Sequence, residues 1–296
     1  MKITEYPGSI PLFRKANTKT IKKGEFETEL IFDSVNIIEE YTLQVQILSE
    51  SADQPAGELA MRITCTPTYL PELVLGRLLT EGYIHSTDEI KELEVIGDEH
   101  LAKVILEDSG KMPSTARPSE NDTAASANGT EMPLSAQPVE TVSTCSVDER
   151  TIQGLLRREQ EIRPIPTPER APKLSWLWKL EDRFGEDTEL HKKTHATHSC
   201  FLMREGEIIF EAEDIGRHNA IDKAVGWAVR RGISTQKCIL YTSGRMPVDM
   251  VRKVIRAGIP VMVSKEAPTS AGIQMAEKYG LTLIDLNPQK VTLFFH

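Results

Sequence analysis

The chain has 296 residues, 40% of them hydrophobic, which is enough for one large or two moderate domains with a substantial core. Its formal net charge of -9 and pI near 5.4 argue against general binding to nucleic acid or to an anionic membrane. No stretch approaches the roughly 18 consecutive apolar residues of a membrane span, and no apolar leader follows Met1, so we expect a cytoplasmic protein.

The first part of the chain has the pattern of a β-rich domain. Residues 42–48 and 58–64 alternate polar and apolar side chains, which is typical of half-buried strands, and we expect them to pair. Residues 70–79 place apolar groups at helical spacing, and Gly82 is a suitable stop. We therefore predict a β-rich α+β domain over residues 1–107.

Two segments of different composition follow. Residues 108–140 are rich in Ser, Thr, Ala and Pro and carry almost no large apolar side chains, which predicts a disordered insertion. Residues 141–197 are charged and interrupted by proline, and we predict that they form a cysteine-bearing loop, a helix and a connecting segment. Trp176 and Trp178 indicate that part of this connection docks on the protein.

From His198 onward, short strands alternate with helices. Residues 201–204 and 207–210 predict a hairpin, and three helices and four strands follow it, of which the last strand is residues 291–295. This order predicts a C-terminal α/β domain over residues 198–296, with a largely parallel sheet covered by helices on its faces.

Three loops of this domain lie between a predicted strand and a predicted helix: residues 214–219, 242–246 and 265–270. In parallel sheets such loops share one edge and present helix N-termini to ligands, so we expect all three to open onto one rim.

The composition of these loops suits an anionic, nucleotide-like ligand. Gly216 and Gly244 permit close backbone approach, and Arg217, Arg245 and Lys265 supply positive charge. A competing interpretation is that the charged side chains Asp214, Arg217 and Asp222 form internal salt bridges, and that Ser243 and Ser270 only cap helices.

Residues 213–223, EDIGRHNAIDK, closely resemble the signature segment of the FdhD/NarQ family. Residues 194–198 resemble the family's Thr-Gly-x-x-His element, and residues 243–245 its Ser-Gly-Arg. Residues 66–67 and 72–82 resemble its Thr-Pro and Glu-Leu-x-Leu-Gly-x-Leu-x-x-Glu-Gly elements. Residues 257–260 and 267–270 resemble its next two loops. The likeness covers about two thirds of the chain.

The resemblance implies a homodimeric sulfur carrier protein. Such a protein takes persulfide sulfur from a cysteine desulfurase and passes it to the bis-molybdopterin guanine dinucleotide cofactor, as formate dehydrogenase or a related molybdoenzyme requires. It also implies a three-layer αβα C-terminal domain similar to cytidine deaminases. From the residues themselves we expect no permanently bound metal. The cofactor-binding residues implied by the motifs and loops are His198, Asp214, Gly216, Arg217, His218, Asn219, Asp222, Lys223, Ser243, Gly244, Arg245, Lys265, Thr269, Ser270, Leu286, Asn287 and Lys290.

The chain departs from the family where the carrier cysteines are expected. The family's Ser-Cys-Gly-x-Cys-Gly corresponds here to residues 143–149, STCSVDE, so only Cys145 is left and Asp148 stands in place of the second cysteine. One thiolate can in principle carry a sulfane sulfur, and Cys145 is the catalytic residue that we predict. The alternatives are that Cys145 is an inert thiol and that the protein is a cofactor-binding chaperone without sulfur transfer. Residues 286–290 also depart from the family's aromatic and arginine-bearing segment, and only Lys290 keeps a charge.

The remaining candidates favour structural roles. The widely spaced Cys65, Cys200 and Cys238 lie in or beside predicted strands and are typical of buried thiols rather than of a disulfide framework. His191, His195 and His198 have a spacing that could hold zinc, but no cysteine or carboxylate follows at the spacing of deaminases. We therefore do not expect deaminase or hydrolase chemistry.

Overall fold

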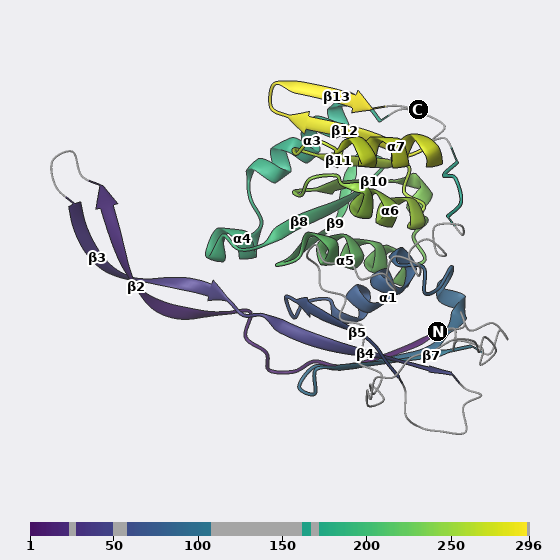
Figure 1. The fold of residues 1–296 in the computed structure, drawn as a ribbon, viewed down its shortest axis with the longest axis horizontal. Coiled ribbons are helices and arrows are strands. Elements are labelled where there is room, and N and C mark those ends of the chain that lie inside the picture. Colours follow the sequence, from purple (N-terminus) through teal and green to yellow (C-terminus); the bar gives the residue numbers. More distant parts are fainter. Residues whose placement is uncertain (24–27, 50–57, 108–161, 167–171, 295–296) are drawn as a thin grey trace, which may run out of the picture.

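The computed structural model describes residues 1–23, 28–49, 58–107, 162–166 and 172–294. The predicted insertion at residues 108–140 and the predicted carrier Cys145 lie outside these residues. The described residues form a five-stranded sheet, a two-stranded ribbon and a six-stranded sheet, together with helices, so the fold is mixed α/β (Figure 1). Within the described residues, no helix is both long and apolar enough to cross a membrane.

The five-stranded sheet is built from the N-terminal part of the chain, in the order β1-β6-β7-β4-β5. Its strands are β1 (Lys2–Tyr6), β4 (Tyr41–Ser49), β5 (Glu58–Cys65), β6 (Ile90–Ile96) and β7 (Leu101–Leu106), and a short 3-10 turn, η1 (Thr87–Glu89), precedes β6. The predicted pairing of β4 with β5 is confirmed, and it is antiparallel. Helix α1 (Leu70–Thr80) packs on one face of this sheet, where apolar side chains from the helix and the strands form a single core.

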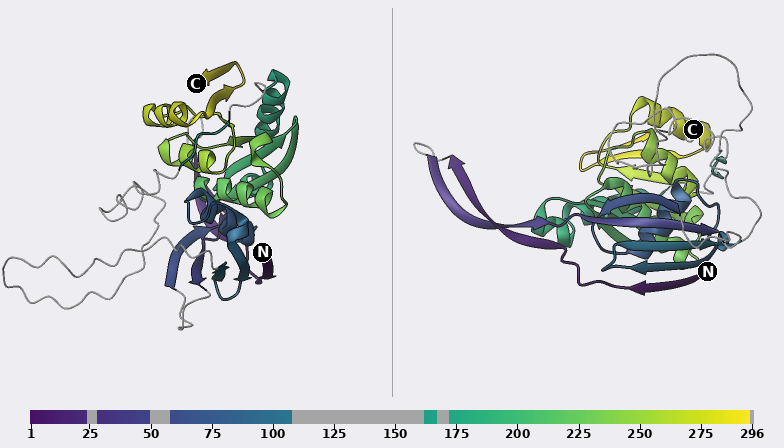
Figure 2. Two further views of the ribbon diagram at one scale, coloured as in Figure 1. Left: turned by 90° about the vertical axis from the view of Figure 1, so that its right-hand side faces the viewer. Right: turned by 60° about the horizontal axis from the view of Figure 1, so that its bottom comes forward.

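A long ribbon leaves this sheet. Strands β2 (Phe13–Lys23) and β3 (Thr28–Ile38) pair only with each other, and the ribbon extends away from the body of the molecule (Figure 2). The sequence did not predict β2, because its five Lys and Arg residues leave few apolar positions to alternate.

The six-stranded sheet has the order β13-β12-β11-β10-β8-β9. Its strands are β8 (His198–Arg204), β9 (Glu207–Asp214), β10 (Cys238–Thr242), β11 (Val261–Ser264), β12 (Thr282–Asn287) and β13 (Lys290–Phe294), and η2 (Thr235–Lys237) precedes β10. The prediction of a largely parallel sheet was wrong: only β10–β11 and β11–β12 are parallel pairs. The tight turns of the hairpins β8–β9 and β12–β13 force antiparallel pairing, and β8 also runs antiparallel to β10.

Helices cover both faces of this sheet. Helices α5 (Arg217–Arg230), α6 (Val248–Arg256) and α7 (Ser270–Tyr279) share one core with it. Helix α3 (Leu174–Gly185) packs on the opposite face through Leu177 and Leu180, and α4 (Glu189–Thr194) follows it. The expected docking around the two tryptophans is thus confirmed for this helix, although Trp178 itself is exposed.

The two halves of the molecule meet where α1 lies against α5 (Figure 1). Glycines let the two helix backbones touch: a Cβ at Gly76 would lie 1.8 Å from the carbonyl oxygen of Asp222. A Cβ at Gly226 would lie 1.8 Å from the carbonyl oxygen of Glu72. Because neither backbone can move without disturbing a core, these two positions cannot hold a larger residue at the present helix spacing.

We expect Gly226→Ala to destabilise the protein, because the added methyl group must push α1 away from α5. Overpacking of this kind costs about 1–3 kcal/mol or more. The matched control is Gly185→Ala at the end of α3, where an added Cβ meets nothing within 4 Å and stability should not fall. Denaturant unfolding followed by circular dichroism compares the two, and equal stability of the variants would contradict the close contact.

Candidate functional site

The three predicted loops do open onto one rim of the C-terminal sheet. Strands β9, β10 and β11 run in the same direction, so their carboxyl ends lie at one edge and lead into α5, α6 and α7. The second and third loops touch, because Ser264 Oγ donates to the carbonyl oxygen of Gly244 at 2.8 Å and Met246 pairs with Pro268. The second and third loops of the rim are therefore in direct contact.

His198 begins β8 at this same edge and is held by Ser243. The His198 Nδ1 and Ser243 Oγ atoms are 3.2 Å apart, and the same hydroxyl accepts a hydrogen bond from the Ser199 amide at 3.1 Å. Burial and the neighbouring Arg217 lower the pKa of His198, which favours the neutral imidazole.

Arg217 lies on the first turn of α5 and packs on the second loop. A Cβ at Gly244 would lie 3.0 Å from Arg217 Cδ, so the glycine makes room for this side chain. The Arg217 Nε atom is buried and has no hydrogen-bond partner among the described residues. A buried donor without a hydrogen-bond partner destabilises the folded protein. An anionic ligand is one partner that would satisfy it.

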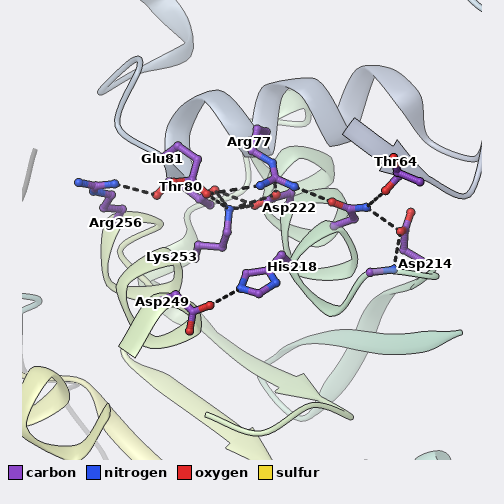
Figure 3. Close-up of polar contacts among 12 residues, drawn as sticks. Thr64, Arg77, Thr80, Glu81, Asp214, His218, Asp222, Asp249, Lys253 and Arg256 are labelled. Atoms are coloured by element: carbon purple, nitrogen blue, oxygen red, sulfur yellow. Dashed lines mark hydrogen bonds and ion pairs between the residues drawn. The ribbon is translucent and has the colours of Figure 1, made fainter. Parts of the chain in front are cut away.

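A second histidine lies beside Arg217. His218 Nε2 is 2.7 Å from Asp249 Oδ2, which links the first turn of α5 to the first turn of α6 (Figure 3). Asp249 was not among the predicted residues, because an acidic residue in the first turn of a helix is ordinary and gives no sign of a histidine partner.

The other loop residues that we predicted to contact the ligand are exposed. Arg245, Lys265, Thr269 and Ser270 all face solvent, and Lys265 Nζ lies 4.6 Å from the centre of the Phe184 ring. Thr269 is the N-cap of α7 and accepts a hydrogen bond from an amide of the first turn, so the competing interpretation of Ser270 as the cap is wrong by one residue. Ser243 caps no helix, since its hydroxyl bonds to the start of β8.

Residues 286–290, which differ from the corresponding family segment, lie at the turn of the β12–β13 hairpin. This turn is at the same edge of the sheet as the three loops. Leu286 is fully buried in the core beneath α3, and its contact with a ligand stays a prediction. Asn287 is partly buried and pairs with Lys290, which is exposed at the turn.

Two residues of the signature segment point inward instead. The buried Asp214 carboxylate accepts from the Thr66 amide at 3.0 Å and forms an ion pair with Lys223 Nζ at 2.7 Å. Lys223 also donates to the carbonyl oxygens of Thr66 and Glu213, both at 3.0 Å. These bonds tie the end of β9 to the segment that follows β5 in the N-terminal half.

Two further residues of the segment are buried against α1. Asn219 accepts a hydrogen bond from Arg77 and donates to the Thr64 carbonyl oxygen at 2.7 Å. Asp222 accepts from Thr80 Oγ1 at 2.6 Å and forms an ion pair with Arg77 Nε at 2.8 Å.

Lys253 completes this buried cluster from α6. Its ammonium group lies 3.0 Å from Asp222 Oδ1 and 2.6 Å from Glu81 Oε1 (Figure 3). Despite burial, Lys253 and Arg77 hold the pKa of Glu81 well below its usual range, so the carboxylate stays charged. We call Arg77, Thr80, Glu81, Asp222 and Lys253 the interdomain charge cluster.

The competing interpretation is thus confirmed for Asp214 and Asp222, which form internal ion pairs, but Arg217 forms none with the described residues. Direct ligand contact by Asp214, Asn219, Asp222 and Lys223 stays a prediction, and their burial gives each of them a structural role. Sequence reasoning missed the partners on α1 and α6, whose pattern shows only ordinary charged helix positions.

The segment before β8 is organised by Glu213. Its carboxylate accepts hydrogen bonds from the amides of Leu190 and His191 at the start of α4, at 3.0 and 2.8 Å. His195 ends α4 in the left-handed conformation with φ 52, at the position where the family element has glycine. The geometry explains why glycine suits that position.

Two histidines of this segment form hydrogen bonds with other residues of the protein. His191 Nδ1 lies 2.9 Å from the Thr197 carbonyl oxygen, and His198 is held by Ser243. Among the residues that the structure describes, no three His, Cys, Asp or Glu side chains converge as metal ligands would.

A cavity of about 570 Å³ lies between β3 and the end of α4, and its lining includes no residue of the three loops.

Three of the four cysteines are buried, as predicted. Burial raises the pKa of the Cys65 thiol to about 12 and of Cys238 to about 11, and it also raises the pKa of Cys200. Thiols in this state are poor nucleophiles at neutral pH.

Comparison with known proteins identifies relatives along most of the chain. The model of the FdhD/NarQ family matches residues 54–296. A protein of Listeria monocytogenes named sulfur carrier protein FdhD is 28% identical over 75% of this chain and 77% of its own length. One of the same name from Methanothermobacter thermautotrophicus is 28% identical over 77% of this chain and 79% of its own length.

One solved structure has a similar fold throughout. It is described as a formate dehydrogenase accessory protein from Desulfotalea psychrophila. The TM-score is 0.67 at 22% sequence identity, and the match covers 97% of this chain and 98% of the other. This likeness extends the shared fold to the N-terminal residues that the family model does not reach.

We expect Asp222→Ala to destabilise the protein strongly, because Arg77 and Lys253 would keep buried positive charges without this partner. Removing one member of a buried ion pair costs about 3–5 kcal/mol. The control is Glu207→Ala, which breaks a solvent-exposed pair with Lys179 and should cost about 0–1 kcal/mol. Urea unfolding of the two variants measures the difference, and a small loss for Asp222→Ala would show that the cluster contributes little.

Proposed function

Because the chain belongs to the FdhD/NarQ family, we propose that it is a sulfur carrier protein that serves the maturation of a formate dehydrogenase. The observation that carries this proposal is the family match over residues 54–296, which spans both α1 and the rim. The relatives named sulfur carrier protein FdhD support it over the alternative of a chaperone that transfers no sulfur.

The carrier thiol in this proposal is Cys145. The other three thiols are buried and their raised pKa values disfavour the reactive thiolate. In the loading step, the Cys145 thiolate attacks the outer sulfur of a persulfide on a cysteine desulfurase. The desulfurase S–S bond breaks, its own thiolate leaves, and Cys145 becomes the persulfide, so no external oxidant or reductant is needed.

The rim is the proposed binding site for the bis-molybdopterin guanine dinucleotide cofactor, to which the sulfur is passed. Its phosphates suit Arg217, whose Nε has no hydrogen-bond partner among the described residues, and the exposed charges of Arg245 and Lys265. His198 and His218 would add hydrogen bonds from the same edge. When bound, the cofactor supplies the molybdenum centre that receives the sulfur.

Other parts of the proposal come from the family resemblance. They are a homodimeric assembly, contact with a cysteine desulfurase and with formate dehydrogenase or a related molybdoenzyme, a cytoplasmic location and a likeness of the C-terminal domain to cytidine deaminases. The three layers of that domain, with α3 on one side of the sheet and α5, α6 and α7 on the other, support the last of these.

We expect the protein to gain the mass of added sulfur on Cys145 when it is incubated with a cysteine desulfurase and cysteine. Intact-mass spectrometry under non-reducing conditions should show an adduct that dithiothreitol removes and that Cys145→Ser lacks. Cys238→Ala, which removes a buried thiol, is the control and should keep the adduct. An adduct that persists in Cys145→Ser, or none in the unaltered protein, would contradict the carrier role.

A further inference from the structure

The rim holds two histidines with different partners. His198 Nδ1 lies 3.2 Å from the neutral hydroxyl of Ser243, whereas His218 Nε2 lies 2.7 Å from the Asp249 carboxylate. In each ring the second nitrogen forms no hydrogen bond with another described residue. Each imidazole is therefore held at one nitrogen and offers the other, and only His218 has a carboxylate partner.

Asp249 is well placed to act on His218. It lies in the first turn of α6, where free amides and the helix dipole favour a negative charge. The hydrogen bond from His218 and bonds from nearby backbone amides lower the pKa of Asp249 to about 2, in spite of partial burial. The carboxylate is thus ionised at any physiological pH and accepts a hydrogen bond from Nε2.

A carboxylate at one nitrogen fixes both the tautomer and the orientation of an imidazole. With Nε2 donating to Asp249, Nδ1 carries the lone pair in the neutral ring and becomes a second donor in the cation. His218 follows Arg217 in sequence, and the Arg217 Nε has no partner among the described residues. A ligand phosphate that reaches Arg217 would therefore meet an imidazole already held in place.

We propose that Asp249 is a positioning residue, which holds the protonated ring of His218 so that Nδ1 donates a hydrogen bond to the phosphate of the ligand beside Arg217. This rests on the proposed function, because it assumes that the rim binds a guanine nucleotide. The sign of the effect separates it from simple electrostatics. Removing a negative charge from a site for an anion should tighten binding, whereas loss of a positioning residue should weaken it.

The test compares the binding of GDP and of guanosine to the full chain by isothermal titration calorimetry. We expect Asp249→Ala to weaken GDP binding by about tenfold or more, the size of one hydrogen bond to a charged group. Guanosine binding should change little, because it has no phosphate. Asp249→Glu should restore most of the GDP affinity.

Two further variants make the comparison specific. In His218→Ala, additional removal of Asp249 should have little effect on GDP binding, because a positioning residue acts only through its partner. Glu277→Ala removes an exposed acidic residue of α7 that lies outside the rim loops, and it should leave GDP binding unchanged.

The outcomes separate the inference from the proposed function. GDP affinity that is unchanged or tighter in Asp249→Ala would overturn the positioning role while leaving the nucleotide site intact. Equal weakening of GDP and guanosine would overturn it as well, since it would indicate a general loss of structure. Failure of the unaltered protein to bind GDP would count against the nucleotide site itself and, with it, this inference.

Discussion

The position of the rim depends on one buried carboxylate, that of Asp222. It lies between α1 and α6 with no exposed surface, and Thr80, Arg77 and Lys253 surround it. Arg77 and Lys253 also share Glu81, so the cluster pairs two cations with two anions. The α1 and α5 backbones also touch at glycines. These backbone contacts and the buried ion pairs together hold the N-terminal half against the helices that carry the rim loops.

As a result, the side chains of the signature segment, residues 213–223, point to two different sides. Asp214, Asn219, Asp222 and Lys223 face the N-terminal half, where each meets a partner from β5, α1 or the loop between them. Arg217 and His218 lie on the other side of the same helix turn and face the rim. A single segment thus joins the two halves and supplies part of the proposed ligand surface, so a change in the joint will also disturb the rim.

Much of this could be predicted from local sequence patterns. Alternation and helical spacing located the β4–β5 pair, α1, α5 and the loops of the rim, because each pattern depends on residues close in the chain. The parallel sheet was predicted wrongly, since alternation does not reveal that β8 inserts between β9 and β10. The partners Arg77, Lys253 and Asp249 were also missed, because each meets its partner across more than thirty residues or between different helices. Which charged residues of a motif face inward is decided by such distant contacts.

The most direct test of this division compares Arg217→Ala with Lys223→Met, one residue from each side of the segment, by thermal unfolding and by GDP binding. The account predicts that Arg217→Ala lowers GDP affinity with little change in Tm. It predicts that Lys223→Met lowers Tm by several degrees, because about 3–5 kcal/mol is lost when the buried Asp214 carboxylate loses its cation. A variant Lys223→Met that unfolds like the unaltered protein and fails only in GDP binding would contradict the account.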